Sequence, residues 1–307
     1  MSDPIQLIYI TGRGHSGSTL LDLLISAHPD VVSVGEAKCL VTRPDEPCTC
    51  GADTVFVCPF WTRVDAALQE GAGLRLREID IDSLDAETFA AHNRAFFEAV
   101  ARVTGRRFIV DSSKNVDRLA ALLEAALFPV RAIHLVRSPY GVVYSNARRG
   151  RDWLYHTYNY TYAMMKTRRL LEGREHLEVR YEELVHQPRR AVERIMDEIG
   201  LAFDPGQLDW AKPARHNIYG NPMRFATEST IRLDTKWRKG LSLRQKLAIG
   251  WLTTPCRFKG TGVYERWKPL FEREGVRTWW RWRRKAWRKS LRTRLRAWMK
   301  AARGALH

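Results

Sequence analysis

The sequence predicts an α/β protein of three layers, α/β/α, with helices on both faces of a central parallel sheet. Three observations indicate this class. Short β-branched runs alternate with segments of helical spacing along much of the 307 residues. The first run, at 5–10, leads through a glycine-rich turn directly into a helical pattern. Several later runs end in polar residues, and open α/β sheets form their ligand sites outside the carboxyl ends of the strands.

Composition and charge divide the chain into two parts. Hydrophobic residues make up 45% of it, which is enough for a sizeable core. The formal net charge is +17, and twelve Lys and Arg residues lie in 277–303, where no acidic residue occurs. We therefore expect one domain over 1–274 and a basic tail over 275–307. The sequence has no signal-peptide pattern at its start and no run of about 18 apolar residues, so we expect a cytoplasmic protein.

A glycine-rich loop joins the first expected strand to the first expected helix. The amides of such a loop and the helix N-terminus bind anions, most often phosphates. The loop matches the P-loop pattern G-x-x-x-x-G-K-[ST] at Gly12, Gly17 and Thr19. Ser18 stands at the lysine position, and that lysine normally contacts the β- and γ-phosphates. The loop is therefore predicted to hold a phosphate without a γ-phosphate; an ordinary turn between strand and helix is the alternative.

Polar residues follow two further expected strands. Glu36 comes after the β-branched run at 31–34, on the same sheet edge as the loop. A surface carboxylate is the alternative for this residue. A strand over 107–110 ends in the polar cluster at 111–115, and we expect Lys114 in the first turn of the next helix. A cation is unfavourable there for the helix dipole, which indicates an anionic partner.

An arginine and a serine follow the next expected strand, at 132–136. Arg137 ends this strand, and Ser145 lies eight residues later in a helix expected over 140–149. Two helical turns separate them, so both side chains can contact one anion. Arginine binds phosphate through two parallel hydrogen bonds. A salt bridge is the alternative for Arg137.

Four of the five cysteines lie in an irregular, proline-containing segment expected over 37–65. They are Cys39, Cys48, Cys50 and Cys58. Four cysteines this close could bind zinc, but their spacing is not C-x2-C. A disulfide or buried thiols fit this spacing better than a metal site.

Further helical patterns cover 84–104, 153–171 and 188–199, and a strand is expected over 177–180. From 204 to 240 the chain is predicted to be loop. So long a loop in a compact domain usually has a function.

The tail combines basic residues with tryptophan at helical spacing. Its apolar positions recur every three, four or seven residues, at Trp280, Trp287, Leu291, Leu295, Trp298 and Ala302. A basic amphipathic helix over 276–303 suits an anionic membrane surface. Docking of that face on the domain is the alternative. Nucleic acid is not expected, because no recognised binding module accompanies the charge.

Taken together, these stretches resemble the sulfotransferases that use 3′-phosphoadenosine 5′-phosphosulfate (PAPS). GRGHSGSTLL is similar to their 5′-phosphosulfate loop, often written R-S-G-T-T. IHLVRSPYGVVYSNARRG is similar to their 3′-phosphate motif, with Arg137 and Ser145 at its binding positions. VSVGE puts Glu36 where tyrosylprotein-sulfotransferase-like enzymes carry their proposed base. VDSSKN and LEVRYEELVHQP fit less specifically, and the resemblance covers roughly 5–245.

The resemblance implies in-line transfer of a sulfuryl group from PAPS to an acceptor hydroxyl, with adenosine 3′,5′-bisphosphate as product. Glu36 would take the acceptor proton, while Lys114 and His15 would stabilise charge on the bridging oxygen. The PAPS-binding residues would be Arg13, Gly14, His15, Ser16, Gly17, Ser18 and Thr19 in the loop, Arg137 and Ser145, and Arg232, Trp237, Arg238 and Lys239 in the long segment. No metal is implied for this reaction.

One departure from the family pattern is His15, where the family usually has Arg or Lys. Its charge is tunable near neutral pH, so a donor, a cation or a base all fit, and Arg13 would supply the missing permanent charge. Two other functions fit part of the sequence. One is a P-loop kinase, which the absent lysine disfavours; the other is a non-catalytic adaptor that binds membranes or polyanions.

The acceptor has no recognisable signature. A carbohydrate, a lipid-linked molecule or a small metabolite fits the resemblance equally. If the tail binds membranes, the enzyme would be peripheral on the inner face of a membrane and the acceptor lipid-linked.

Overall fold

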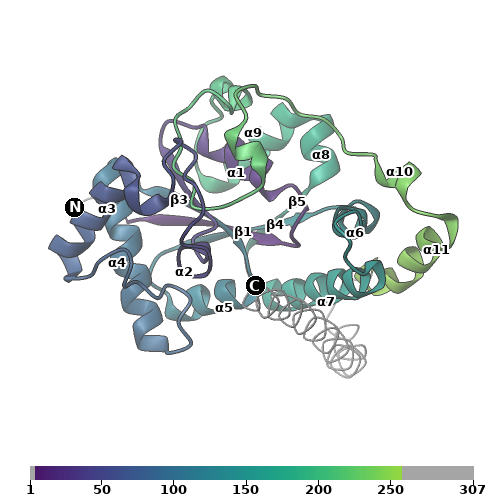
Figure 1. Cartoon of the computed structure of the whole chain (residues 1–307), viewed down its shortest axis with the longest axis horizontal. Coiled ribbons are helices and arrows are strands. Elements are labelled where there is room, and N and C mark those ends of the chain that lie inside the picture. The colour runs from purple at the N-terminus through teal and green to yellow at the C-terminus, as the bar shows by residue number, and fades with distance from the viewer. Residues whose placement is uncertain (1–3, 258–307) are drawn as a thin grey trace, which may run out of the picture.

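The fold is a five-stranded parallel sheet between two layers of helices (Figure 1). A computed structural model describes residues 4–257, so the expected tail helix over 276–303 lies outside the described residues. The strand order is β2-β3-β1-β4-β5, and every neighbouring pair is parallel. The strands are β1 (Gln6–Gly12), β2 (Val31–Gly35), β3 (Phe108–Lys114), β4 (Val130–Val136) and β5 (His176–Arg180). The predicted α/β class is confirmed.

The helices follow the strands in alternation and cover both faces of the sheet. They are α1 (Ser18–Ser26), α2 (Cys39–Thr42), α3 (Pro59–Ala72), α4 (Ala86–Thr104), α5 (Val116–Ala125), α6 (Pro139–Ala147), α7 (Trp153–Leu171), α8 (Tyr181–His186), α9 (Pro188–Ile199), α10 (Trp237–Gly240) and α11 (Leu243–Leu252). Short 3-10 turns are η1 (Val55–Val57), η2 (Pro205–Asp209), η3 (Pro222–Phe225) and η4 (Thr254–Arg257). None of the helices described is long and apolar enough to span a bilayer.

The predicted bounds of α7 and α9 match the structure, whereas α3 and α11 were not predicted. Helix α3 begins inside the segment 37–65, which was predicted to be irregular. That prediction rested on the prolines and cysteines of the segment, which are typical of loops. Pro59 instead occupies the first helical turn, where its missing N–H is not needed. Helix α11 begins at a capping box formed by Ser242 and Gln245, which is a start signal present in the sequence.

Strand β3 is longer than predicted, so Lys114 lies at the end of this strand and not in the helix that follows. The strand continues through Lys114, and Asn115 then caps α5 by accepting a hydrogen bond from the Asp117 amide. The expectation that Lys114 lies in a helical turn is therefore wrong. Pairing of β3 with both β1 and β2 extends the strand through the polar cluster.

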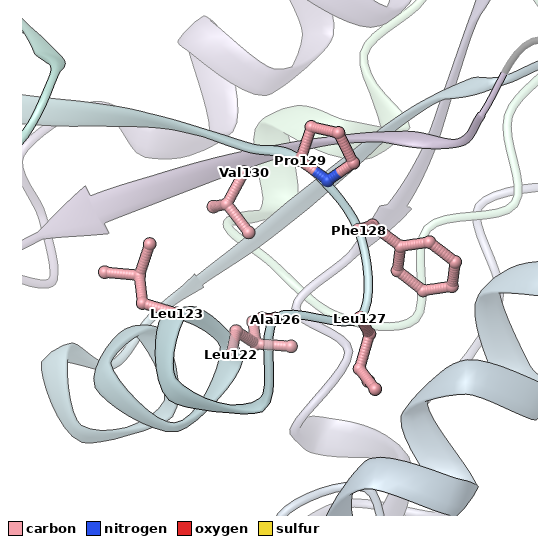
Figure 2. A pocket seen from close by; sticks show the side chains of 7 residues that line it. All are labelled: Leu122, Leu123, Ala126, Leu127, Phe128, Pro129 and Val130. Atoms are coloured by element: carbon pink, nitrogen blue, oxygen red, sulfur yellow. The ribbon is translucent and has the colours of Figure 1, made fainter.

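An apolar hollow (Figure 2) lies beside the start of β4, whereas the glycine-rich loop follows the carboxyl end of β1. It is lined by the end of α5 and the segment that leads into β4: Leu122, Leu123, Ala126, Leu127, Phe128, Pro129 and Val130. These side chains carry no titratable or hydrogen-bonding group. The hollow therefore has none of the chemistry expected of a site for a phosphorylated substrate.

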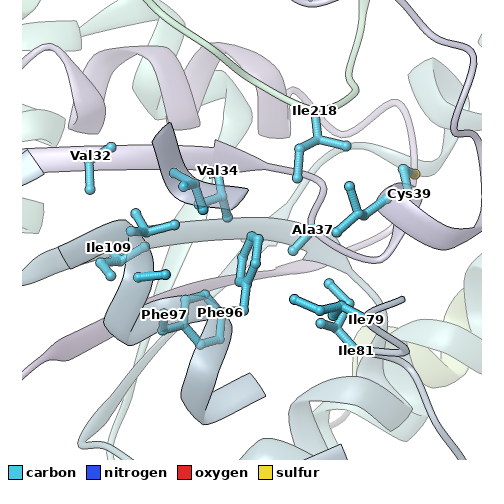
Figure 3. Packing of buried hydrophobic residues seen from close by; sticks show 14 of the residues in the cluster. Val32, Val34, Ala37, Cys39, Ile79, Ile81, Phe96, Phe97, Ile109 and Ile218 are labelled. Atoms are coloured by element: carbon cyan, nitrogen blue, oxygen red, sulfur yellow. The ribbon is translucent and has the colours of Figure 1, made fainter. Parts of the chain in front are cut away.

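Two hydrophobic cores fill the space between the sheet and its helices. Leu7 and Tyr9 of β1 face one core, and Ile8 and Ile10 face the other, as alternation along a strand requires. In the first core, Val32, Val34 and Ile109 of the sheet pack near Phe96 and Phe97 of α4 (Figure 3). The second core is formed mainly by α1 and α9. Together the two cores hold the carboxyl ends of the strands in fixed register.

His134 lies fully buried in β4, and it makes the fold sensitive to acid. Burial lowers the pKa of His134 from its usual 6.5 to about 4, although Glu178 opposes the shift. Between these two pH values the unfolded chain binds a proton that the folded chain does not, so stability falls as the pH falls. Burial also lowers the pKa values of His15 and His156 to about 4, which adds in the same direction.

We expect the free energy of unfolding to decrease from pH 7 to pH 4.5, with His134 alone contributing about 2–3 kcal/mol. Urea unfolding of the wild type and of His134→Met at a series of pH values measures this. The variant should have a shallower pH dependence. An identical slope for both proteins would contradict the assignment.

Candidate active site

The carboxyl ends of four strands bring the predicted site residues to one edge of the sheet. Strand β1 leads into the glycine-rich loop, β2 into Glu36, β3 ends at Lys114 and β4 leads into Arg137. The strand order places β1 between β3 and β4. The loop is therefore flanked by Lys114 on one side and Arg137 on the other. The sequence predicted this common edge for the loop and Glu36, whereas it put Lys114 in a helical turn rather than at the end of β3.

The loop from Arg13 to Gly17 ends at the N-terminus of α1, which has free hydrogen-bonding capacity. Helix α1 begins at Ser18 with no side-chain cap and no acidic residue in its first turn. Its first amides are thus available to an anion, and the helix dipole favours one there. The hydroxyl of Ser16 is buried without a hydrogen-bond partner among the described residues, so it also needs one. The Thr19 hydroxyl accepts from the Asn221 amide, which leaves its own proton to donate.

Two features of the structure require glycine at position 17: the backbone conformation there and the closeness of the Tyr181 ring. The Gly17 φ of 96° is in the left-handed region, and a Cβ there would lie 2.5 Å from the ring of Tyr181. We expect Gly17→Ala to lower the free energy of unfolding by about 1–3 kcal/mol. Gly14→Ala is the matched control, because Gly14 has no atom within 4 Å of an added Cβ. Chemical denaturation of both variants checks this, and equal stability would contradict the close packing on Tyr181.

His15 is held in an unusual conformation among positive charges. Its φ is 69°, its carbonyl accepts a hydrogen bond from Arg137 at 2.9 Å, and its Nε2 lies 2.8 Å from Arg149. Burial first, and then Arg149 and Arg151, lower the pKa of His15 to about 4. The imidazole is therefore neutral at pH 7 in the loop without an anion. Its nitrogens can donate or accept hydrogen bonds, but His15 does not replace the family's fixed positive charge in this state.

The guanidinium group of Arg137 ties the loop to the helix that follows β4. The side chain is nearly buried, and its guanidinium lies 4.3 Å from the centre of the Tyr181 ring. A second nitrogen approaches a carboxylate oxygen of Asp234 at 3.4 Å. A Cβ added to Gly141 of α6 would lie 2.8 Å from Arg137 Nε, so the arginine crosses α6 at this glycine.

Ser145 lies one turn beyond Gly141 on the same face of α6, and it is buried. This places the serine on the helix surface that Arg137 covers. The structure therefore brings Arg137 and Ser145 to one region beside the loop.

The long segment that follows α9 passes this region. The carbonyl of Arg232 accepts a hydrogen bond from the Tyr181 hydroxyl at 3.3 Å. Trp237 stacks on Tyr140 of α6, with ring centres 4.9 Å apart. The side chains of Arg232, Arg238 and Lys239 are exposed.

Glu36 and Lys114 form an ion pair at the ends of β2 and β3. Both side chains are largely shielded, with 9% and 15% of their surfaces exposed. Lys114 has a φ of 63°, an uncommon value for a residue other than glycine, and strained residues of this kind cluster at functional sites. The turn before Glu36 is also constrained. A Cβ at Gly35, where φ is 71°, would lie 3.0 Å from both the Asn217 side chain and the Ile218 amide.

A buried polar network behind the loop was not predicted from the sequence. The Ser112 hydroxyl donates to an Asp22 oxygen at 2.6 Å, and Asn217 donates to Ser33 at 3.0 Å. Burial raises the pKa of Asp22 to about 6. The network links α1, β2 and β3 to the segment around Asn217. No motif spacing indicates it, because its four members are far apart in the sequence.

The cysteines are free thiols, and His216 joins them. Cys39, Cys48 and Cys58 are buried, whereas Cys50 is exposed. Cys48, Cys50 and Cys58 form a cluster with His216, which comes from the long segment after α9. The sequence placed these cysteines near one another but gave no indication of the histidine.

Comparison with known proteins agrees with this geometry. The model of the sulfotransferase family matches residues 7–205. The solved sulfotransferase domain from the Synechococcus PCC 7002 olefin synthase superimposes with a TM-score of 0.53 at 22% identity, covering 85% of this chain and 98% of that domain. The sulfotransferase domain from the curacin biosynthetic pathway gives 0.53 at 17% identity, covering 82% and 98%.

At such low identity these two structures establish the fold alone. Among curated proteins, none matches the chain. The family match spans the glycine-rich loop, Glu36, Lys114, Arg137 and Ser145, which are the residues gathered at the sheet edge. The resemblance predicted from the motifs is confirmed at the level of the family. This chain belongs to the sulfotransferase family.

Proposed function

We propose that this protein transfers a sulfuryl group from PAPS to an acceptor hydroxyl. The observation that carries the proposal is the position of Arg137. Its guanidinium donates to the carbonyl of His15 in the loop and also crosses the face of α6 that carries Ser145. These contacts support two adjoining candidate anion sites, which a donor with both a 5′-phosphosulfate and a 3′-phosphate would need. A nucleotide with only 5′-phosphates would leave the second site empty.

In this proposal the loop and α1 bind the 5′-phosphosulfate. The amides from Gly14 to Thr19 and the hydroxyls of Ser16, Ser18 and Thr19 would donate hydrogen bonds to its oxygens. Arg137 and Ser145 would bind the 3′-phosphate, with Asp234 displaced from the guanidinium. Arg232, Arg238 and Lys239 are exposed cations on the passing segment, and Trp237 fixes that segment on α6 through Tyr140.

The ion pair of Glu36 and Lys114 supplies the chemistry in this proposal. Glu36 places a carboxylate beside the Lys114 ammonium at this edge, and a carboxylate can accept the proton of an acceptor hydroxyl. Lys114 would then stabilise charge on the bridging oxygen as the bond to sulfur breaks. His15 would donate a hydrogen bond to the same group, and Arg13 and Arg149 would add positive charge. The transfer would be in line and rest mainly on positioning and charge stabilisation.

The acceptor in this proposal is a hydroxyl on a carbohydrate, a lipid-linked molecule or a small metabolite. We also propose that the basic segment over 276–303 brings the enzyme to an anionic membrane surface from the cytoplasmic side. Flotation with anionic vesicles tests this second point. The chain truncated after Glu274 should lose binding, and undiminished binding would reject a membrane role for the tail.

A mixture of candidate acceptors is sufficient to test the reaction. The purified protein is incubated with sulfur-labelled PAPS and a metabolite extract, and labelled products are identified by mass spectrometry. We expect new sulfated molecules together with release of adenosine 3′,5′-bisphosphate. Labelled products at the level of a boiled-enzyme control, with extracts from several sources, would contradict the proposal.

A further inference from the structure

Four potential metal ligands meet at one point beside the active-site edge, outside the residues used above. The sulfur atoms of Cys48, Cys50 and Cys58 and a ring nitrogen of His216 all lie within 4.8 Å of one another. Cys58 Sγ is 3.2 Å from His216 Nδ1 and 3.5 Å from Cys50 Sγ, and Cys48 Sγ is 3.9 Å from the same nitrogen. His216, which is 158 residues from Cys58 in the sequence, is thus the fourth potential ligand beside the three cysteines.

These distances agree with a tetrahedral zinc site. Zinc binds thiolate sulfur at about 2.3 Å and imidazole nitrogen at about 2.0–2.1 Å, which separates neighbouring ligands by about 3.5–3.8 Å. Three of the six separations, from 3.2 to 3.9 Å, bracket that range, and all six are within 4.8 Å. Three cysteines and one histidine are also a usual ligand set for structural zinc, in which all four positions are filled by the protein.

The surroundings hold the ligands ready for a cation. The His216 ring stacks on Phe60, with centres 4.7 Å apart and planes 11° apart, which fixes the ring orientation. Cys58 lies at the N-cap of α3, and the amides of Phe60 and Trp61 donate toward its sulfur. The Ala52 amide donates toward Cys50 in the same way. These contacts fix the positions of the ligand atoms around one point.

The cluster also joins two segments that shape the Glu36 turn. The Trp61 indole donates to the His216 carbonyl at 2.7 Å, and the Thr49 hydroxyl donates to the Arg215 carbonyl at 2.6 Å. The Ile218 amide donates to Val34 in β2, two residues before Glu36. A metal ion at the cluster would thus fasten the cysteine segment and the His216 segment against the end of β2.

We propose that Cys48, Cys50, Cys58 and His216 bind one structural Zn²⁺ ion, which stabilises the wall of the active site next to Glu36. Binding forms three Zn–S bonds and one Zn–N bond, and the protons of the three thiols leave to solvent. All four positions are taken by protein ligands, so the ion would have no catalytic role. The inference rests on these contacts alone and does not depend on the sulfuryl donor proposed above.

The test is the metal content of the full-length chain, purified under reducing conditions without a metal column or chelator. Mass spectrometry of the digested protein should give one zinc per chain. X-ray absorption at the zinc edge should show about three sulfurs at about 2.3 Å and one nitrogen at about 2.0 Å. These two measurements use the wild type, so they decide the question even if a variant fails to fold.

The variants Cys58→Ser and His216→Ala should lose the zinc, whereas Cys256→Ser, which removes a cysteine outside the cluster, should retain it. Less than about one-tenth of an equivalent of zinc in the wild type, even after incubation with Zn²⁺ and buffer exchange, would overturn the proposal. A disulfide between Cys50 and Cys58, detected as an intact mass lower by two hydrogens in protein kept reduced, would overturn it as well.

Discussion

Glu36→Gln is expected to slow sulfuryl transfer by about 10²–10⁴-fold, the usual contribution of a general base. Glutamine keeps the shape of the side chain but cannot accept the proton of the acceptor hydroxyl. Because the substitution leaves the loop and Arg137 intact, the affinity for adenosine 3′,5′-bisphosphate should change by less than about threefold. The expected result is thus a loss in kcat with little change in binding of the nucleotide.

Labelled-sulfate transfer with saturating PAPS measures the rate, and calorimetry measures the affinity. Glu70→Gln is the matched control, since it breaks an exposed ion pair with Arg102 elsewhere on the protein. Transfer at a near-wild-type rate in Glu36→Gln would remove this residue as the base.

Arg137→Ala should weaken binding of adenosine 3′,5′-bisphosphate by at least about 10²-fold. Hydrogen bonds to charged groups contribute about 1.5–3 kcal/mol each, and arginine makes two to one phosphate. The substitution also removes the hydrogen bond that holds the His15 carbonyl, so binding at the loop should suffer as well. Arg137→Lys should restore only part of the affinity, because lysine cannot make the paired contact.

Arg131→Ala is the control for this prediction. Arg131 lies near the opposite end of the same strand in an exposed ion pair with Glu175, so its loss should leave nucleotide affinity unchanged. Calorimetric titration of the three variants and the wild type gives the comparison. Unchanged affinity in Arg137→Ala would contradict the assignment of the 3′-phosphate site.

Much of the fold could be predicted because its signals are local. The bounds of α7 and α9 follow from helical spacing, and α9 begins at Pro188 as expected of a helix start. Strand β3 was predicted too short because its last residues are polar. Its length is set by pairing with strands on both sides, which no local pattern reports.

The candidate site was predictable to the extent that it lies in contiguous motifs. The loop, Arg137 and Ser145 belong to stretches with fixed internal spacing, and the structure brings them together. Tyr181 was not singled out, although it contacts both Gly17 and Arg137. His216 was missed for the same physical reason. Each of these residues reaches the site by a long chain connection, so the sequence gives no spacing from which to infer its contacts.

The neutral state of His15 could not be predicted either. Its pKa depends on burial and on Arg149, whose position is fixed only by the packing after α6. From sequence the residue could be a donor, a cation or a base. In the structure His15 is uncharged and lies among Arg13, Arg149 and Arg151. These arginines carry the permanent positive charge of the loop region.

The most direct test of the central claim is a comparison of three nucleotides on the wild-type protein by calorimetry. If Arg137 and Ser145 bind a 3′-phosphate beside the loop, adenosine 3′,5′-bisphosphate should bind at least about 10²-fold more tightly than adenosine 5′-monophosphate. ATP should gain nothing from its γ-phosphate, because Ser18 replaces the P-loop lysine. Equal affinity for the bisphosphate and the monophosphate, or tightest binding of ATP, would contradict the account.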